Sequence, residues 1–224
     1  IASNNGDSGV VYSSSNNNVC STGTQPGTIN IKGAGSCTIT ATVGNTNNCT
    51  YSTTAATYTI TVNKAAGSVT TAPTPNTNLI YTGNNIQLLS AGGSGTGTML
   101  FKVGSGSWTS TLSSVTGKSA GTYTVYYKAS ASTNYNESAS ASTSVTIAKA
   151  AMTCCTPTVK SGLVYNGSSH ALVNDCAPTG GDIYYATAST GAGSATTVPS
   201  ATTAGTYNRW YKCVPDSNHS GGTS

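Results

Sequence analysis

A nine-residue segment occurs twice in this chain, and its repetition limits the folds that the chain can adopt. AGTYTVYYK, residues 120–128, returns as AGTYNRWYK, residues 204–212, at an offset of 84 residues (204 − 120). Other patches recur at the same offset: LIYTG at 79–83 returns as LVYNG, MLF at 99–101 returns as IYY, and Asn134-Tyr135 returns as Asn218-His219. Separated patches that share one offset indicate a tandem array of small modules, not one large domain.

Apolar and polar residues alternate through much of the chain, as they do in half-buried β-strands. Glycine-rich turns separate the alternating runs, which include residues 28–32, 38–43, 58–62, 99–103, 123–128 and 144–147. Only 6% of the residues are charged, but the 13 tyrosines and the valines and isoleucines of these runs favour packed strands over disorder. The sequence therefore predicts an all-β fold.

Two parts of the chain resemble known bacterial repeats. Residues 13–43, SSSNNNVCSTGTQPGTINIKGAGSCTITATV, resemble the second half of a bacterial Ig-like group 2 repeat of intimin- and invasin-type surface proteins, with Cys20 where that family usually has a small apolar residue. Residues 70–149 resemble the Ig-like repeats of very large bacterial surface proteins, with which they share the AGTY and YK motifs. This resemblance implies tandem Ig-like β-sandwich modules.

Three modules are expected, of which the first and the last are incomplete: a partial module at 1–64, a complete one at 65–149, and one at 150–224 that lacks its last strand. The segments TVNKAAG and TIAKAAM share Lys-Ala-Ala, so Lys64 and Lys149 mark equivalent joints. A sandwich without its last strand has an open edge. Either the chain continues, which we favour because the first module also begins part-way through, or a neighbouring subunit donates the strand.

The repeated segment has its own signature of glycine and tyrosine. In the Ig fold, a tyrosine near the start of this strand forms a corner in which its hydroxyl bonds backbone a few residues upstream. The resemblance gives this role to Tyr123 and Tyr207, and the shared positions are Gly121, Tyr123, Tyr127, Gly205, Tyr207 and Tyr211. Arg209 stands where the first copy has Val125, on a face that should be partly buried.

Seven cysteines in a chain of this size indicate an oxidising, extracellular compartment. The resemblance to Ig domains implies a bridge between Cys176 and Cys213, and within the first module, where Cys20 is the third cysteine, we favour Cys37 with Cys49. Cys154 and Cys155 are adjacent at a joint, so their side chains face opposite sides of an extended segment. We expect one of them to form a bridge between modules and the other to be free or intermolecular.

Residues that could support catalysis or cofactor binding are few. The chain has five acids and two histidines, and none of the acids recurs at the repeat offset. A glycosidase needs two carboxylates on one cleft, and a serine hydrolase of the α/β type needs a GxSxG motif that is absent. We expect no enzymatic activity, no bound cofactor and no metal site, although Asp175 and Asp182 are a weak candidate pair for binding calcium. A Lys–Asn cross-link between Lys128 and Asn134, or between Lys212 and Asn218, is also disfavoured because no acid recurs beside them.

Charge and hydropathy limit the partners. The net charge is +4, but the nine basic residues are scattered singly, which argues against nucleic acid. No apolar run approaches the ~20 residues of a membrane helix. Trp108 and Trp210 are candidates for stacking on glycans, although packing under hairpins is the favoured interpretation.

The sequence predicts a structural or adhesive segment of an extracellular or cell-surface protein, with modules that serve as stalk, spacer or filament body. Its expected partners are further modules or neighbouring copies. The alternatives are a module that binds glycans or a host surface protein, and a filament subunit that exchanges strands.

Overall fold

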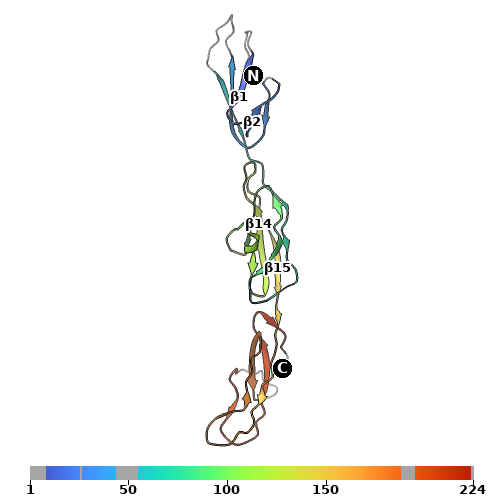
Figure 1. Ribbon diagram of the computed structural model, residues 1–224, viewed down its shortest axis with the longest axis vertical. Coiled ribbons are helices and arrows are strands. Elements are labelled where there is room, and N and C mark those ends of the chain that lie inside the picture. The colour runs from blue at the N-terminus through green and yellow to red at the C-terminus, as the bar shows by residue number, and fades with distance from the viewer. Residues whose placement is uncertain (1–8, 26, 44–54, 188–194, 223–224) are drawn as a thin grey trace.

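A computed structural model describes residues 9–25, 27–43, 55–187 and 195–222. Within these residues the regular structure is β-strand, apart from one short 3-10 turn. Figure 1 shows three groups of strands that follow one another along the long axis of the molecule. We name the described parts of residues 1–64, 65–149 and 150–224 the N-terminal, central and C-terminal modules.

The N-terminal module has a three-stranded antiparallel sheet in the order β1-β4-β5 and a separate β2-β3 pair. Its strands are β1 (Val10–Ser14), β2 (Cys20–Thr22), β3 (Ile29–Ile31), β4 (Gly35–Val43) and β5 (Ala56–Val62). β3, β4 and β5 coincide with the alternating runs 28–32, 38–43 and 58–62. The buried side chains of the module form one cluster of Val19, Cys20, Cys37 and Ile39.

The central module is built around a four-stranded sheet in the order β12-β14-β15-β8, in which β8 is parallel to β15. Three two-stranded pairs, β13-β9, β10-β7 and β11-β6, complete it. Its elements are β6 (Val69–Thr71), β7 (Thr74–Pro75), β8 (Leu79–Ile80), β9 (Ile86–Gln87), β10 (Leu89–Ala91), β11 (Ser94–Gly95), β12 (Met99–Val103), η1 (Leu112–Ser114), β13 (Thr116–Gly117), β14 (Gly121–Ala129) and β15 (Ala141–Ala148).

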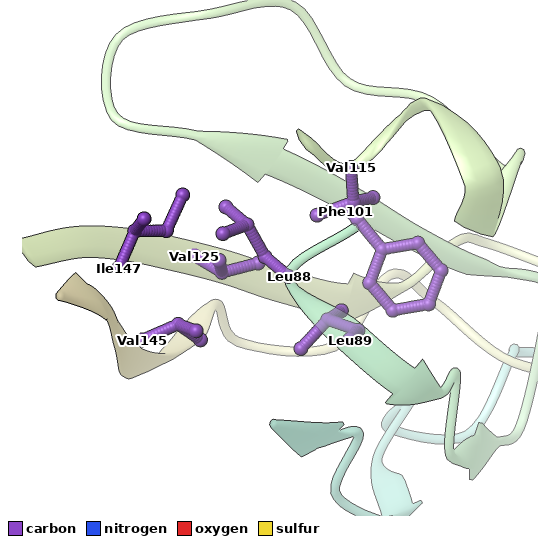
Figure 2. Packing of buried hydrophobic residues seen from close by; sticks show 7 residues of the cluster. All are labelled: Leu88, Leu89, Phe101, Val115, Val125, Val145 and Ile147. Atoms are coloured by element: carbon purple, nitrogen blue, oxygen red, sulfur yellow. The ribbon is translucent and has the colours of Figure 1, made fainter. Parts of the chain in front are cut away.

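The core of the central module lies between the four-stranded sheet and the segment that runs from β9 to β10. Its buried side chains are Leu88, Leu89, Phe101, Val115, Val125, Val145 and Ile147, shown in Figure 2. Burying one such side chain contributes roughly 1.5–3 kcal/mol. The last strand, β15, supplies two of the seven, so this strand is a main part of the core.

The C-terminal module repeats the central one. Its strands are β16 (Ala150–Ala151), β17 (Thr158–Val159), β18 (His170–Ala171), β19 (Val173–Asn174), β20 (Gly181–Ala186), β21 (Ser200–Ala201), β22 (Trp210–Pro215) and β23 (His219–Ser220). The pairing of β20 with β22 places Ile183 opposite Cys213, just as Met99 lies opposite Ala129 in the β12-β14 pair. The β18-β21 pair likewise has the register of β9-β13. The sequence repeat is therefore a structural repeat.

The two copies of the AGTY segment differ in one respect. The first copy lies in β14 from Gly121 onward, whereas the second is strand only from Trp210 onward. The first four residues of β14 are paired with β15 alone, and no described strand takes the place of β15 beside residues 205–209.

Candidate functional site

The joint between the N-terminal and central modules is held by Asn134. Its side-chain Oδ1 accepts a hydrogen bond at 2.8 Å from the backbone N–H of Ala34, and its backbone oxygen accepts one at 2.9 Å from Ala65. The Ala65 carbonyl in turn accepts from Asn136 at 2.8 Å, and the Lys64 ammonium donates to the carbonyl of Ser132 at 2.7 Å. One asparagine thus bonds to the preceding module through its side chain and to the first residue of its own module through its backbone oxygen.

The joint between the central and C-terminal modules has the same construction. Oδ1 of Asn218 accepts from the backbone N–H of Ala120 at 2.9 Å, and the Asn218 backbone oxygen accepts from Ala150 at 3.0 Å. The parallel pairing of β16 with β23 continues this contact. Asn134 and Asn218 are repeat-equivalent, and Ala65 and Ala150 both follow the lysine of a Lys-Ala-Ala segment. We call each arrangement an asparagine clasp.

The alanine that donates to each clasp is followed by a glycine with an unusual backbone. Gly35 has a φ of 134° and Gly121 has a φ of 148°. A side chain rarely adopts this conformation, whereas glycine does so readily. For Gly121 the surrounding space is open, so the backbone conformation and not crowding requires the glycine.

A ring contact is added at the second joint. The rings of Tyr81 and His219 meet edge to face, with centroids 5.3 Å apart. His219 Nδ1 lies 2.7 Å from a carboxylate oxygen of Asp216, and the backbone N–H of Asn218 donates to the same oxygen at 2.8 Å. The hydrogen bond with His219, followed by that from Asn218, lowers the pKa of Asp216. This carboxylate orders the turn that carries the clasp asparagine.

The predicted tyrosine corners are present in both copies. The hydroxyl of Tyr123 donates to the carbonyl of Ser119 at 2.8 Å and accepts from the Ser119 N–H at 3.0 Å. The hydroxyl of Tyr207 donates to the carbonyl of Thr203 at 2.7 Å. Of the other signature residues, Gly121 and Tyr127 lie in β14, Tyr211 lies in β22, and Gly205 precedes β22.

The cysteine pairing differs from the prediction. Cys37 is bonded to Cys20, because β4 and β2 bring them together in the core of the N-terminal module, so the expected partner was wrong. The predicted partner, Cys49, lies outside the described residues.

The pairing of Cys176 with Cys213 was also wrong. Cys213 is bonded to Cys154, and Cys176 is bonded to Cys155. The adjacent cysteines do face opposite ways, as expected, but both partners lie within the C-terminal module. The expected bridge between modules and the expected free or intermolecular thiol are therefore corrected to two internal bridges.

The two candidate glycan-stacking tryptophans have different surroundings. The ammonium groups of Lys102 and Lys128 lie 5.1 and 4.5 Å from the ring centroid of Trp108, and Lys128 also forms an ion pair with Glu137 at 2.8 Å. Cations therefore already contact the Trp108 ring. Trp210 is 39% exposed at the start of β22.

The remaining candidate residues are engaged in local contacts. The hydroxyl of Tyr185 donates to Asp175 at 2.6 Å, and burial together with this carboxylate raises the pKa of Tyr185. Asp182 is exposed on β20. Among the described residues, no three His, Cys, Asp or Glu side chains gather as a metal site. Arg209 stacks on Tyr207, with 5.2 Å from its guanidinium carbon to the ring centroid.

The asparagine clasps were not predicted as contacts, although the sequence carried their signal. Asn134 and Asn218 are visible as a repeated pair, and Ala120-Gly121 returns as Ala204-Gly205 at the same offset. The missing information was that the donors are backbone N–H groups, which any residue type except proline provides.

Comparisons with protein-family models, curated proteins and solved structures gave no match to this chain. None of the helical structure in the described residues is long and apolar enough to cross a membrane.

Proposed function

We propose that this chain is a structural segment of an extracellular protein, in which Ig-like sandwich modules form a stalk, spacer or filament body. The observation that carries the proposal is the asparagine clasp, which recurs at both joints and sets the modules end to end (Figure 1). Because both joints use the same hydrogen bonds, each module is expected to have the same fixed orientation relative to the one before it, as a stiff stalk requires. The role assigned to the chain is mechanical, and it includes no catalysis.

The sandwich interpretation has support from the central module. The sheet β12-β14-β15-β8 faces the β9 to β10 segment across one apolar core, and a tyrosine corner lies at the start of the interior strand β14. Both features are typical of Ig-like folds. Three disulfides in the described residues support an oxidising compartment.

The test of this proposal is small-angle X-ray scattering of the 224-residue chain and of a variant that carries Asn134→Ala and Asn218→Ala. The wild-type chain should scatter as a rod one module thick. The double variant should have a shorter mean maximum dimension and a more flexible profile, because each joint loses its side-chain hydrogen bond. The control is Asn30→Ala, which removes an exposed asparagine side chain on β3 and leaves all the clasp atoms in place.

A wild-type profile typical of independently tumbling beads would contradict the proposed stiff segment. An unchanged profile in the double variant would instead show that the clasps do not set the stiffness. Equal thermal unfolding of the variants would show that the modules themselves remain folded.

A further inference from the structure

A turn in the C-terminal module contains an Asn-Gly pair whose asparagine side chain is contacted by two donors. The backbone N–H of Ser168 donates to Oδ1 of Asn166 at 2.9 Å, and Nε2 of His170 lies 2.8 Å from the same oxygen. A backbone N–H can only donate, so the atom that it contacts is the amide oxygen and not the amide nitrogen. That oxygen can only accept, so Nε2 of His170 carries a proton and donates it. Two N–H groups are therefore directed at one side-chain carbonyl.

The backbone that follows the asparagine is accessible for attack on this carbonyl. Gly167 has a φ of 78°, and nothing lies within 4 Å of the place where its side chain would begin. Among the described residues, the Gly167 N–H takes part in no hydrogen bond. Asn166 and Gly167 are both exposed to solvent. The Gly167 nitrogen is therefore an unhindered nucleophile one residue away from a polarised amide.

The central module has the same turn without this chemistry. Gly83, equivalent to Gly167, has a φ of 79°, and Thr82 Oγ1 accepts from the backbone N–H of Asn84 at 3.4 Å. Ile86 stands at the position of the histidine. Thr82 and Asn84 are exposed in the central module as well, so exposure is a property of the turn itself. Both turns use a side-chain acceptor and a glycine, whereas the amide and the imidazole occur in the C-terminal module alone.

We propose that Asn166 is a site of spontaneous modification, at which the chain converts its own asparagine into aspartate or isoaspartate. The Gly167 nitrogen forms a bond to Cγ of Asn166, and the bond between Cγ and Nδ2 breaks. The proton of the Gly167 amide passes through water to the leaving nitrogen, so that ammonia departs and a succinimide ring remains. One water molecule then opens the ring at either of its carbonyls. The inference is independent of the proposed mechanical role.

The two donors stabilise the charge that develops in the first step. When the Gly167 nitrogen attacks, negative charge gathers on Oδ1 of Asn166, and N–H groups directed at a developing oxyanion lower the barrier. Ser168 supplies one donor from the turn, and His170 supplies the second from the start of β18. Because the turn is open to water, each donor should contribute less than in a closed active site. We expect the ordinary effect of a single hydrogen bond, a factor of about 2 to 12.

The experiment follows Asn166 by peptide mapping and mass spectrometry in the full chain, held in neutral buffer. The folded chain should convert Asn166 faster than the same chain kept unfolded in denaturant and reductant, because the two donors are brought together only by the fold. Isoaspartate should be among the products, since opening of the ring at the second carbonyl produces it. Conversion that is equally fast or faster in the unfolded chain would overturn the proposal, and so would a product without isoaspartate.

Two variants test the imidazole. His170→Ile introduces the residue that the central module has at this position, and it should slow the conversion about 2- to 12-fold. The matched control is Thr82→Asn, which creates a second Asn-Gly pair in a turn where Ile86 offers no donor. The new pair should convert at the rate of the His170→Ile chain. Melting curves equal to that of the unmodified chain would show that both variants are folded.

The same two variants can contradict the proposal. A conversion rate that His170→Ile leaves unchanged would show that the imidazole takes no part. A new pair in the Thr82→Asn chain that converts as fast as Asn166 would assign the reaction to the Asn-Gly dipeptide alone and not to the two donors.

Discussion

Asn218 accepts a hydrogen bond from the backbone N–H of Ala120 across the boundary between two modules, at 2.9 Å. Asn134 makes the equivalent bond with Ala34 at the preceding boundary, at 2.8 Å. In both cases the asparagine also accepts at its backbone oxygen from the alanine that starts its module. One residue thus bonds to the preceding module through its side chain and to the start of its own module through its backbone oxygen.

The first prediction concerns the Ala120 amide. Asn218→Ala removes its acceptor, and a hydrogen bond of this kind contributes about 0.5–1.5 kcal/mol. The Ala120 N–H should then exchange with solvent about 2- to 12-fold faster, as measured by NMR hydrogen exchange. Asn218→Asp keeps an acceptor oxygen and should retain most of the protection. Exchange at Ala34 should not change, and loss of protection at both alanines would indicate general loosening instead.

The second prediction concerns the tyrosine corner of the central module. Tyr123→Phe removes a hydroxyl that both donates to and accepts from Ser119, so the module should lose about 1–2 kcal/mol of unfolding free energy. Denaturant unfolding followed by circular dichroism measures this loss. Tyr58→Phe is the control, because Tyr58 is 73% exposed on β5. A corner that contributes nothing would leave the two variants equally stable.

Much of the fold could be predicted because it follows from local pattern. Alternation predicted β4, β12, β14 and β15, and the offset between the AGTY copies predicted equal registers in the central and C-terminal modules. The tyrosine corners also follow from the short segment around Gly-Thr-Tyr. Such features depend on neighbours in the chain, and the sequence displays those neighbours directly.

Other features could not be predicted because they depend on contacts between distant segments. Cys20 and Cys37 are partners because β2 and β4 meet in one core, which spacing alone does not show. The short β22 likewise accompanies the lack of a second described strand beside it, since β20 is its one described neighbour. At the clasps, the donors are backbone groups that residue types do not mark.

The third prediction is mechanical. The bond between Cys154 and Cys213 closes a segment with a sequence separation of 59, which pulling on the chain ends cannot extend while the disulfide is intact. At about 3.3–3.6 Å per residue, reduction should lengthen the unfolded chain by about 200 Å from this loop. The Cys20–Cys37 loop, with a separation of 17, should add about 60 Å. Single-molecule force spectroscopy with and without reductant measures both gains.

Variants separate the contributions of the two loops. Cys154→Ser with Cys213→Ser should show most of the larger gain without reductant, and reductant should then release the Cys20–Cys37 loop and the Cys155–Cys176 loop. The bond between Cys155 and Cys176 lies inside the larger loop and remains as a shorter closed segment in this variant, so the gain should be reduced by that segment. A gain of the full size in the double variant would contradict the pairing of Cys155 with Cys176.

The fourth prediction is a pH dependence that separates the two joints. The pKa of Asp216 is lowered from its ordinary value of 3.8 by the hydrogen bonds with His219 and from Asn218. A carboxylate with a depressed pKa in the folded state stabilises that state above its unfolded pKa, and the contribution is lost as the pH falls through the folded pKa. The hydrogen bonds of Asp216 at the second joint should therefore be kept at pH 5 and lost progressively below about pH 3.8. The ring NMR shifts of Tyr81 and His219, whose rings are in contact, measure this loss.

The first joint provides an internal control for this prediction. The residue equivalent to Asp216 is Ser132, and the residue equivalent to His219 is Tyr135, so neither member of the pair is a carboxylate or an imidazole there. The amide shifts of Ala34 and Ala65 should stay constant over the pH range in which those of Ala120 and Ala150 move. Asp216→Asn should remove the acid transition from the second joint, because its side chain still accepts a hydrogen bond but does not titrate. Parallel movement at both joints would assign the effect to unfolding of the modules and not to Asp216.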